Sequence, residues 1–365
     1  MSAGPRPRAA ELPLGRVCIV MMSAVGDTVH VLPVVNALKR HDPSTRVTWV
    51  LQPGPATLVR GHPHVDDIVV FDRARGLRAF LDVRRALRGH RFDLTLDLQV
   101  YFKAGIVTAL TRAPVKLGFD RARARDLNWL FTNRRIPPHA PQHVQDQYFE
   151  FLDYLGVPRG PLEWELGPWE GERAWQREFF ARLERPAAAL VVATSKPEKD
   201  WRPERWAEVV DALYYDFGLQ PVIVGGTSAR ELDAERLVRE RARHAPHSAL
   251  GSGLRRLTAI LDGAALAIAP DTGPLHMAVA LDRPVISLMG ATNPKRTGPY
   301  RKFQDLIVDA YGDAGEDYAP SAEWRRGRMA RIQVRDVLDM VERWRERYAP
   351  RYPARYPLRV GAPNS

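Results

Sequence analysis

The chain has 365 residues, more than one hydrophobic core usually supports, so we expect two domains of about 150 to 180 residues. Hydrophobic residues make up 45% of the chain and charged residues 27%, which excludes a largely disordered protein, and the single cysteine, Cys18, excludes an intramolecular disulfide and a cysteine-built metal site. A formal charge of +11 indicates an anionic partner, for which nucleic acid, a membrane face and a phosphorylated substrate are the candidates.

The sequence contains neither a targeting signal nor a nucleic-acid-binding motif. Residues 1–13 hold no apolar stretch of signal-peptide length, and no apolar run reaches the roughly 20 residues that span a bilayer, so we expect a cytoplasmic protein. The sequence contains no zinc-finger spacing and no RNA-binding aromatic motif, so nucleic acid is not the expected partner. Most arginines lie scattered on helix-like stretches such as RARGLRAFLDVRRALRGHR, which is typical of a solvated surface.

The first half of the chain alternates apolar β-rich runs with helical patterns. Strands are predicted at 17–21, 47–51, 68–71 and 94–98, with a helix over 29–39. Strand, helix, strand repetition with short loops indicates a parallel sheet with helices on both faces. Between 134 and 169 the alternation of strands and helices becomes less regular, and Pro, Gly and Trp cluster there. We interpret this segment as a linker that contains one helix near 144–155.

The second half repeats the architecture. Strands are predicted at 190–193, 221–224, 265–269 and 285–289, with helices over 205–217 and 231–243 and a closing helix over 332–348. We therefore predict an α/β fold of two doubly wound Rossmann-like domains, 14–165 and 166–348, between flexible tails at 1–13 and 349–365.

The first candidate site lies where the first strand runs into Gly26 and Asp27, with Thr28 opening a helix. Ligands of open α/β sheets bind at the carboxyl ends of strands, and Gly26 permits a tight turn or a close backbone approach. The alternative is that Asp27 simply caps the helix. No GxGxxG fingerprint occurs anywhere in the chain.

The second candidate site follows the strand LVVA and comprises Thr194, Ser195, Lys196 and Lys199. Hydroxyls and two ammonium groups at a strand's carboxyl end form a phosphate cradle. Only seven of the 54 basic residues are lysines, and two of them fall within four residues here. A solvated loop is the alternative interpretation.

A third strand, turn and helix brings Asp271, Thr272, Gly273 and His276 to a helix start. Free N–H groups and the positive end of the helix dipole suit a diphosphate, and Asp271 as a helix cap is compatible with that use. Weaker signals come from Thr292 and Gly298, which would line the same cleft, and from Glu231. Glu231 is either a ribose contact or an ordinary first-turn glutamate.

Taken together, SAVGDTVHVLP, TSKPEKDW, DTGPLHMAVAL and GATNPKRTGPY resemble, in their order and spacing, glycosyltransferase family 9, the heptosyltransferases. The resemblance implies a GT-B fold, in which two Rossmann-like domains face a cleft. It also implies inverting transfer of heptose from ADP-heptose to an anionic lipopolysaccharide inner-core acceptor, without metal or cofactor.

The resemblance also implies roles for individual residues. Asp27 corresponds to the catalytic base and Lys199 to the residue that holds the donor phosphates. The other matched residues lie beside the donor: Thr194 and Ser195 as hydroxyls near the phosphates, Asp271, Thr272, Gly273 and His276 as the diphosphate loop and its neighbours, and Glu231 as a ribose contact.

Two other classes of protein remain open at this point. One is another GT-B nucleotide-sugar enzyme such as an epimerase, and the other is a nucleotide-sugar-binding protein without turnover. For the transferase we further expect peripheral contact with the cytoplasmic face of the inner membrane.

Overall fold

The computed structural model describes residues 12–352, 355 and 356, and the chain divides into two compact units. The first unit comprises the described residues up to Ala140 together with Val144–Glu165, and the second comprises Pro141–His143 and the described residues from Leu166 onward. Residues 1–11, 353, 354 and 357–365, which hold most of the predicted tails, lie outside the described residues.

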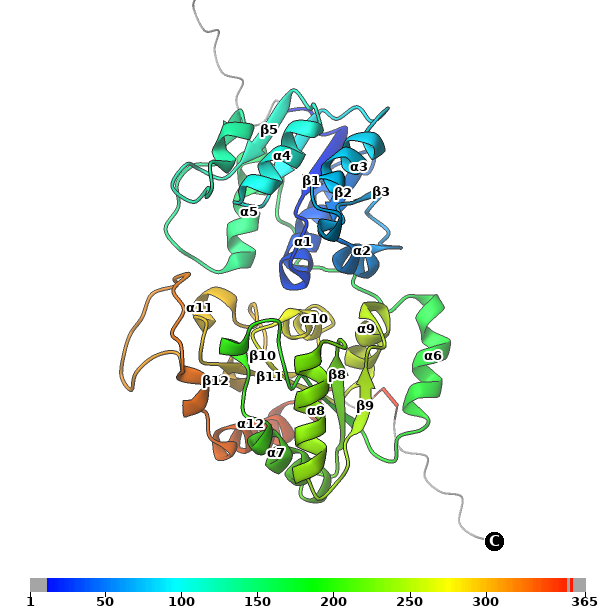
Figure 1. The fold of residues 1–365 in the computed structure, drawn as a ribbon, viewed down its shortest axis with the longest axis vertical. Coiled ribbons are helices and arrows are strands. Elements are labelled where there is room, and N and C mark those ends of the chain that lie inside the picture. Colours follow the sequence, from blue (N-terminus) through cyan, green and yellow to red (C-terminus); the bar gives the residue numbers. More distant parts are fainter. Residues whose placement is uncertain (1–11, 353–354, 357–365) are drawn as a thin grey trace, which may run out of the picture. The chain divides into compact units, whose positions relative to one another are not determined.

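The first unit is built on one parallel six-stranded sheet in the order β3-β2-β1-β4-β5-β6 (Figure 1). The strands are β1 (Arg16–Val20), β2 (Arg46–Leu51), β3 (Asp67–Val70), β4 (Leu94–Asp97), β5 (Val115–Gly118) and β6 (Arg134–Arg135). The helices are α1 (Val25–His41), α2 (Pro53–Val59), α3 (Arg78–Ala86), α4 (Phe102–Leu110) and α5 (Val144–Leu155), with 3-10 turns η2 (Arg73–Arg75) and η3 (Asn128–Phe131).

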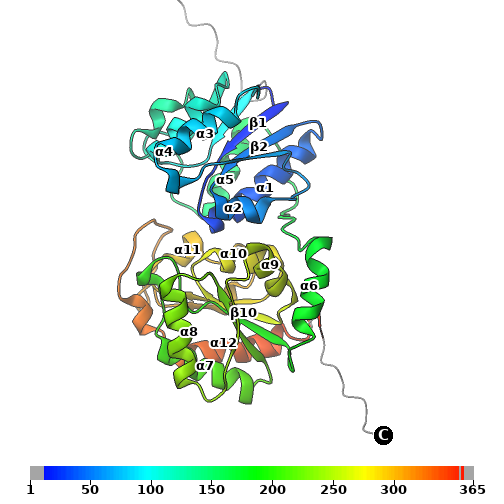
Figure 2. The same ribbon diagram turned by 45° about the vertical axis from the view of Figure 1, so that its right-hand side comes forward.

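The second unit repeats this strand order in a second parallel sheet, β12-β11-β10-β7-β8-β9. Figure 2 shows β10 in the interior of this unit. The strands are β7 (Ala187–Leu190), β8 (Gln220–Gly225), β9 (His247–Leu250), β10 (Leu266–Pro270), β11 (Val285–Met289) and β12 (Ile307–Asp309). The helices are α6 (Glu170–Phe180), α7 (Pro203–Tyr215), α8 (Ala229–Arg241), α9 (Leu254–Gly263), α10 (Gly273–Ala280), α11 (Pro294–Thr297) and α12 (Val334–Arg347), with 3-10 turns η4 (Pro197–Lys199), η5 (Gln304–Leu306) and η6 (Arg328–Arg331).

Burial of the central strands explains why the sequence forms these sheets. Strands β2, β7, β10 and β11 are buried along almost their whole length, because helices cover both faces of a parallel sheet. Apolar runs at those positions therefore remove side chains from water on both faces. The prediction of two doubly wound Rossmann-like domains is confirmed.

The main differences from the prediction concern α1, β7 and α5. Helix α1 begins at Val25 rather than Thr28, which places Gly26 and Asp27 in its first turn. Strand β7 is the alanine-rich segment Ala187–Leu190, whereas the more β-branched LVVA run was expected to form it. Helix α5 is not part of a linker, because it packs on α1, where the side-chain amide of Gln145 donates to the His30 carbonyl at 2.8 Å.

The end of the chain also differs from the expectation of a flexible tail. Helix α12 packs on α7, and the Trp344 indole donates to the Ala265 carbonyl at 3.2 Å. Beyond it, the Arg355 guanidinium lies 2.9 Å from the Asp262 carboxylate, and the Tyr356 ring stacks on Phe180 at 4.8 Å between centroids. These two residues therefore rest against the second unit. Within the described ranges, no helix combines the length and the apolar character that crossing a membrane requires.

Candidate functional site

Each sheet has one point at which its strand order reverses, between β1 and β4 in the first unit and between β7 and β10 in the second. Chain connections leave such a point in opposite directions, and the carboxyl ends of the two strands border a crevice that binds ligands in open α/β sheets. Asp27 follows β1, Lys199 follows β7 and Asp271 follows β10. The principal predicted site residues thus lie at these two switch points.

Asp27 is half-buried in the first turn of α1 and is held by two contacts within its unit. Its Oδ2 accepts a hydrogen bond from the Ala24 backbone N–H at 3.0 Å, and its Oδ1 accepts one from the Tyr148 hydroxyl at 3.1 Å. The N-cap of α1 is Ala24, which has no side-chain oxygen, so Asp27 serves the helix start from the third helical position. The carboxylate is thereby fixed at the carboxyl end of β1, and Tyr148 is a partner that the sequence did not reveal.

A second carboxylate at the same switch point was missed by sequence analysis. Asp97 ends β4, is fully buried, and accepts a hydrogen bond from the Asn128 side-chain amide at 3.0 Å. Burial raises the pKa of Asp97 to about 7, against the hydrogen bonds that favour its charged form. The side-chain amide of Gln99, two residues after Asp97, donates to the Ser23 carbonyl at 2.7 Å. This bond connects the end of β4 to the loop before α1, the helix that carries Asp27.

In the second unit, the centre of the site is an ion pair between Lys199 and Asp271. The Lys199 ammonium donates to Oδ2 of Asp271 at 2.8 Å and to its backbone oxygen at 3.0 Å. The side chains are 17% and 7% exposed, so this pair is screened far less than a surface pair. An ammonium has three N–H donors, and Asp271 engages two of them, which leaves one for a phosphate oxygen.

Asp271 collects further donors from the loop after β11. The hydroxyls of Thr292 and Thr297 donate to Oδ2 at 2.7 and 3.1 Å, and His276 Nε2 lies 3.4 Å from Oδ1. The hydrogen bond from His276 and the Lys199 charge hold the pKa of Asp271 well below its ordinary value, although burial opposes them. Asp271 is therefore an anion that orients Lys199, and it does not cap the following helix.

Helix α10 starts directly after Asp271. Its N-cap is Thr272, whose side chain makes no capping hydrogen bond, and Gly273 is the first helical residue. Pro274 has no N–H, and the Leu275 N–H donates to the Thr272 carbonyl at 3.0 Å. This helix start therefore offers the Gly273 N–H and a partial positive charge to an anion. The predicted diphosphate loop is thus a helix N-terminus adjoining the Lys199 ammonium.

The loop after β7 is organised by Thr194. Its hydroxyl donates to the Lys196 carbonyl at 2.7 Å, and its backbone N–H donates to Asp200 Oδ1 at 2.7 Å. These bonds fold the segment back so that η4 presents Lys199. Ser195 and Lys196 are exposed. Thr194 therefore stabilises the loop of the predicted phosphate cradle by hydrogen bonds inside the loop.

Two weaker candidates have evident structural contacts. The Glu231 carboxylate accepts hydrogen bonds from the backbone N–H groups of Gly226 and Ser228 at 2.6 and 3.0 Å, which makes it a capping-box residue of α8. A Cβ at Gly298 would lie 2.5 Å from the Pro294 carbonyl oxygen, so glycine is required there for the chain to pass.

The structure thus brings Lys199, Asp271, His276 and Thr292 together, adds Thr297, and places Thr272 and Gly273 at the adjoining helix start. Glu231 lies apart from these contacts, at the start of α8.

Comparison with known proteins gives one consistent family. Residues 80–318 match the model of glycosyltransferase family 9 (heptosyltransferase). The chain is 30% identical over 335 residues to the lipopolysaccharide core heptosyltransferase OpsX of Haemophilus influenzae, covering 89% of this chain and 96% of that protein.

Solved structures agree. The E. coli heptosyltransferase WaaC with ADP aligns over 90% of this chain and 99% of its own, with 26% identity and a TM-score of 0.71. The same enzyme with ADP-2-deoxy-2-fluoro heptose aligns over the same shares of both chains, with 25% identity and a TM-score of 0.68.

Proposed function

Because the chain belongs to glycosyltransferase family 9, the heptosyltransferases, we propose that it transfers heptose from ADP-heptose to an acceptor in the lipopolysaccharide inner core. The chain is a glycosyltransferase by family. The observation that supports this donor is the Lys199 and Asp271 pair beside the start of α10, because an ammonium and the positive end of a helix dipole suit a diphosphate. The E. coli relative was solved with ADP and with an ADP-heptose analogue.

The proposed reaction is one displacement at the anomeric carbon. The acceptor hydroxyl oxygen forms a bond to that carbon, the bond to the diphosphate oxygen breaks on the opposite face, and ADP leaves. Asp27 takes the hydroxyl proton as the new bond forms. A single displacement inverts the anomeric centre, and negative charge accumulates on the departing diphosphate.

In this mechanism the protein's own positive groups stabilise the leaving group. Lys199, already oriented by Asp271, donates its remaining N–H to a phosphate oxygen, and the Gly273 N–H at the start of α10 contacts the diphosphate. Ser195 and Lys196, which are exposed on the same loop, and Glu231, at the start of α8, complete the donor contacts we propose. With these groups in place the reaction needs no metal ion or cofactor.

We also propose that the acceptor is an anionic glycolipid and that the enzyme works in the cytoplasm, in peripheral contact with the inner membrane face. The chain's formal charge of +11 favours such a surface by electrostatic attraction.

The test is incubation of the purified protein with ADP-heptose and a lipopolysaccharide truncated before its heptoses. We expect the acceptor to gain the mass of one heptose and ADP to appear only when acceptor is present. Conversion of the donor sugar without acceptor would instead indicate an epimerase. Tight donor binding without any product would indicate a binding protein.

A further inference from the structure

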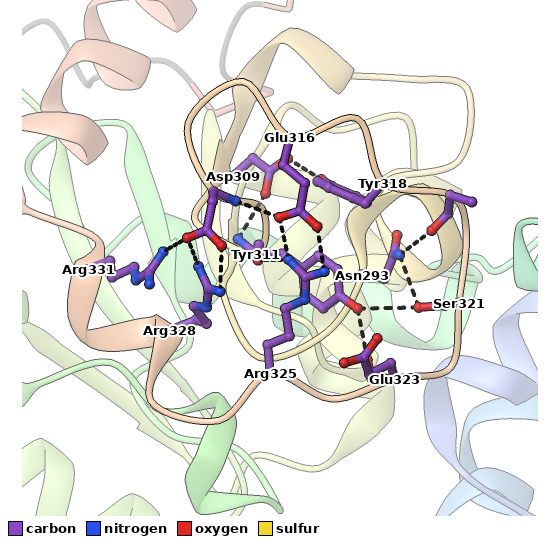
Figure 3. A network of polar contacts seen from close by, with 12 residues as sticks. Asn293, Asp309, Tyr311, Glu316, Tyr318, Ser321, Glu323, Arg325, Arg328 and Arg331 are labelled. Atoms are coloured by element: carbon purple, nitrogen blue, oxygen red, sulfur yellow. Dashed lines mark hydrogen bonds and ion pairs between the residues drawn. The ribbon is translucent and has the colours of Figure 1, made fainter.

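The segment between β12 and η6, residues 310–327, is almost devoid of regular secondary structure, yet ion pairs fix it tightly (Figure 3). At its centre Arg325 donates from Nη1 and Nη2 to the two carboxylate oxygens of Glu316, both at 2.6 Å. Asp313 receives both Arg328, at 2.5 Å, and Arg331, at 2.7 Å. The bidentate pair of Arg325 with Glu316 and the two arginines on Asp313 form a network of ion pairs. Such a network orders a loop more than isolated surface ion pairs do.

This network is anchored on a buried tyrosine. The Arg325 guanidinium lies 4.5 Å from the ring centroid of Tyr311 and donates to the Tyr311 carbonyl at 3.0 Å. Tyr311 is only 1% exposed, so the loop is tied to the body of the second unit. The pairing with Arg325 also lowers the pKa of Glu316 to about 2, so the pair stays charged to a lower pH than an isolated glutamate would.

What the anchored loop carries is Trp324. The Arg325 backbone N–H donates to the Ala291 carbonyl at 3.0 Å, and an antiparallel bridge pairs Trp324 with Thr292. Thr292 is one of the two threonines that donate to Asp271. The loop therefore joins the backbone of the residues that surround the Lys199 and Asp271 pair.

The Trp324 ring lies against Lys199, with 5.0 Å between the Lys199 Nζ and the ring centroid. The same ammonium donates to Asp271, so it contacts both the Trp324 ring and the Asp271 carboxylate. Trp324 is 43% exposed, although the loop that carries it is fixed by the ion pairs of Arg325 and its neighbours. Exposed apolar residues ordinarily need no explanation, but here the surrounding contacts place the ring on a functional ammonium.

We propose that Trp324 is a positioning residue that holds the Lys199 ammonium at the donor diphosphate, with the 310–327 segment as its scaffold. This proposal rests on the phosphate role proposed above for Lys199. A lysine ammonium is a mobile point charge on a flexible stem, so a contact from a second residue restrains it more than Asp271 does alone. An indole face attracts an ammonium more strongly than any other aromatic side chain does.

The test compares Trp324→Leu, which keeps apolar bulk, with Trp324→Phe, which keeps an aromatic face. We expect Trp324→Leu to lower kcat/KM for ADP-heptose by roughly threefold to thirtyfold, the range of one cation–π contact from exposed to desolvated, and Trp324→Phe to recover most of the loss. Because the bridge to Thr292 is made by backbone, both variants retain it. A matched control is Trp175→Leu on α6, where Arg256 lies 5.1 Å from the indole centroid outside the donor site. It should leave kcat/KM unchanged.

The decisive comparison repeats Trp324→Leu in a Lys199→Ala background. If Trp324 acts through Lys199, the second substitution has no further effect there, because the two changes remove one interaction. Wild-type kinetics for Trp324→Leu, equal losses for the Leu and Phe variants, or an undiminished loss in the Lys199→Ala background would each overturn the proposal. Lys199→Ala with wild-type kinetics is a different result, since it would refute the phosphate role itself and this inference with it.

Discussion

Replacing Lys199 by alanine tests the donor site on two measurable quantities. One charge-assisted contact to a developing oxyanion is typically worth about 2.7 to 4 kcal/mol, so Lys199→Ala should lower kcat by roughly a hundredfold to a thousandfold. The donor KM should change less, because the contact strengthens as charge grows on the departing diphosphate. Removing Lys199 also leaves Asp271 buried with only its threonine and histidine donors, and breaking a buried pair costs about 3 to 5 kcal/mol of folding free energy. Since Lys199 is 17% exposed, we expect the lower end of that range.

The assay is ADP release with saturating acceptor, and urea unfolding follows the free energy of unfolding. Lys39→Ala is the control, because Lys39 pairs with Asp66 at 2.9 Å, is 13% exposed, and belongs to the last turn of α1 in the first unit, whereas Lys199 belongs to the second. It should cost stability and leave kcat unchanged. Lys199→Arg should recover only part of the rate, because a planar guanidinium does not occupy the position of a compact ammonium. Equal kcat values for Lys199→Ala and Lys39→Ala would refute the phosphate role.

Three further predictions follow from other contacts. Tyr148→Phe removes the hydroxyl that donates to Asp27, a contact worth about 0.5 to 1.5 kcal/mol. We therefore expect kcat to fall by roughly twofold to tenfold with the donor KM unchanged. A loss of kcat as large as that of an Asp27 variant would contradict the role of Tyr148 as a residue that only orients Asp27. Transfer should persist in excess EDTA; activity that is lost and then restored by magnesium or manganese would refute the metal-free mechanism. The folded-state pKa of Asp97, about 7, lies above its ordinary value of 3.8, so the stability it contributes is full below pH about 4 and lost as pH rises to about 7. In urea unfolding, the wild-type free energy of unfolding should therefore fall by up to roughly 4 kcal/mol between pH about 4 and about 7 because of Asp97, and Asp97→Asn should abolish that part of the fall. If the variant and the wild type show the same pH dependence, the pKa of Asp97 is not raised and the side chain is charged when buried.

The fold was predictable because its signals are local. Apolar runs and helix periodicity are visible in the sequence, so helix α5 and strand β11 were placed at their observed bounds. The failures have physical causes: β7 is alanine-rich and owes its strand state to burial between β8 and β10, and β6 has only two residues. Burial in a sheet is a tertiary effect that no local pattern records.

Site residues could be predicted only where a charged or polar side chain follows the end of a predicted strand. Asp27, Lys199 and Asp271 stand next to recognisable strand and helix boundaries. Tyr148 is 121 positions from Asp27, and Thr297 is 26 positions from Asp271, so only the folded chain brings these pairs together. Trp324 lies in a loop without periodicity, and its position depends on ion pairs that sequence alone does not assign.

The central claim, that this family 9 enzyme uses Asp27 as its catalytic base, is tested most directly by Asp27→Asn. The amide oxygen of asparagine still accepts from Ala24, and its NH2 group donates to the Tyr148 hydroxyl oxygen, so the local geometry is retained while the proton acceptor is lost. We predict that heptose transfer, measured by acceptor mass and ADP release, is abolished while ADP-heptose binding stays within about threefold of wild type. Transfer at more than about a tenth of the wild-type rate would contradict the assignment of Asp27 as the base.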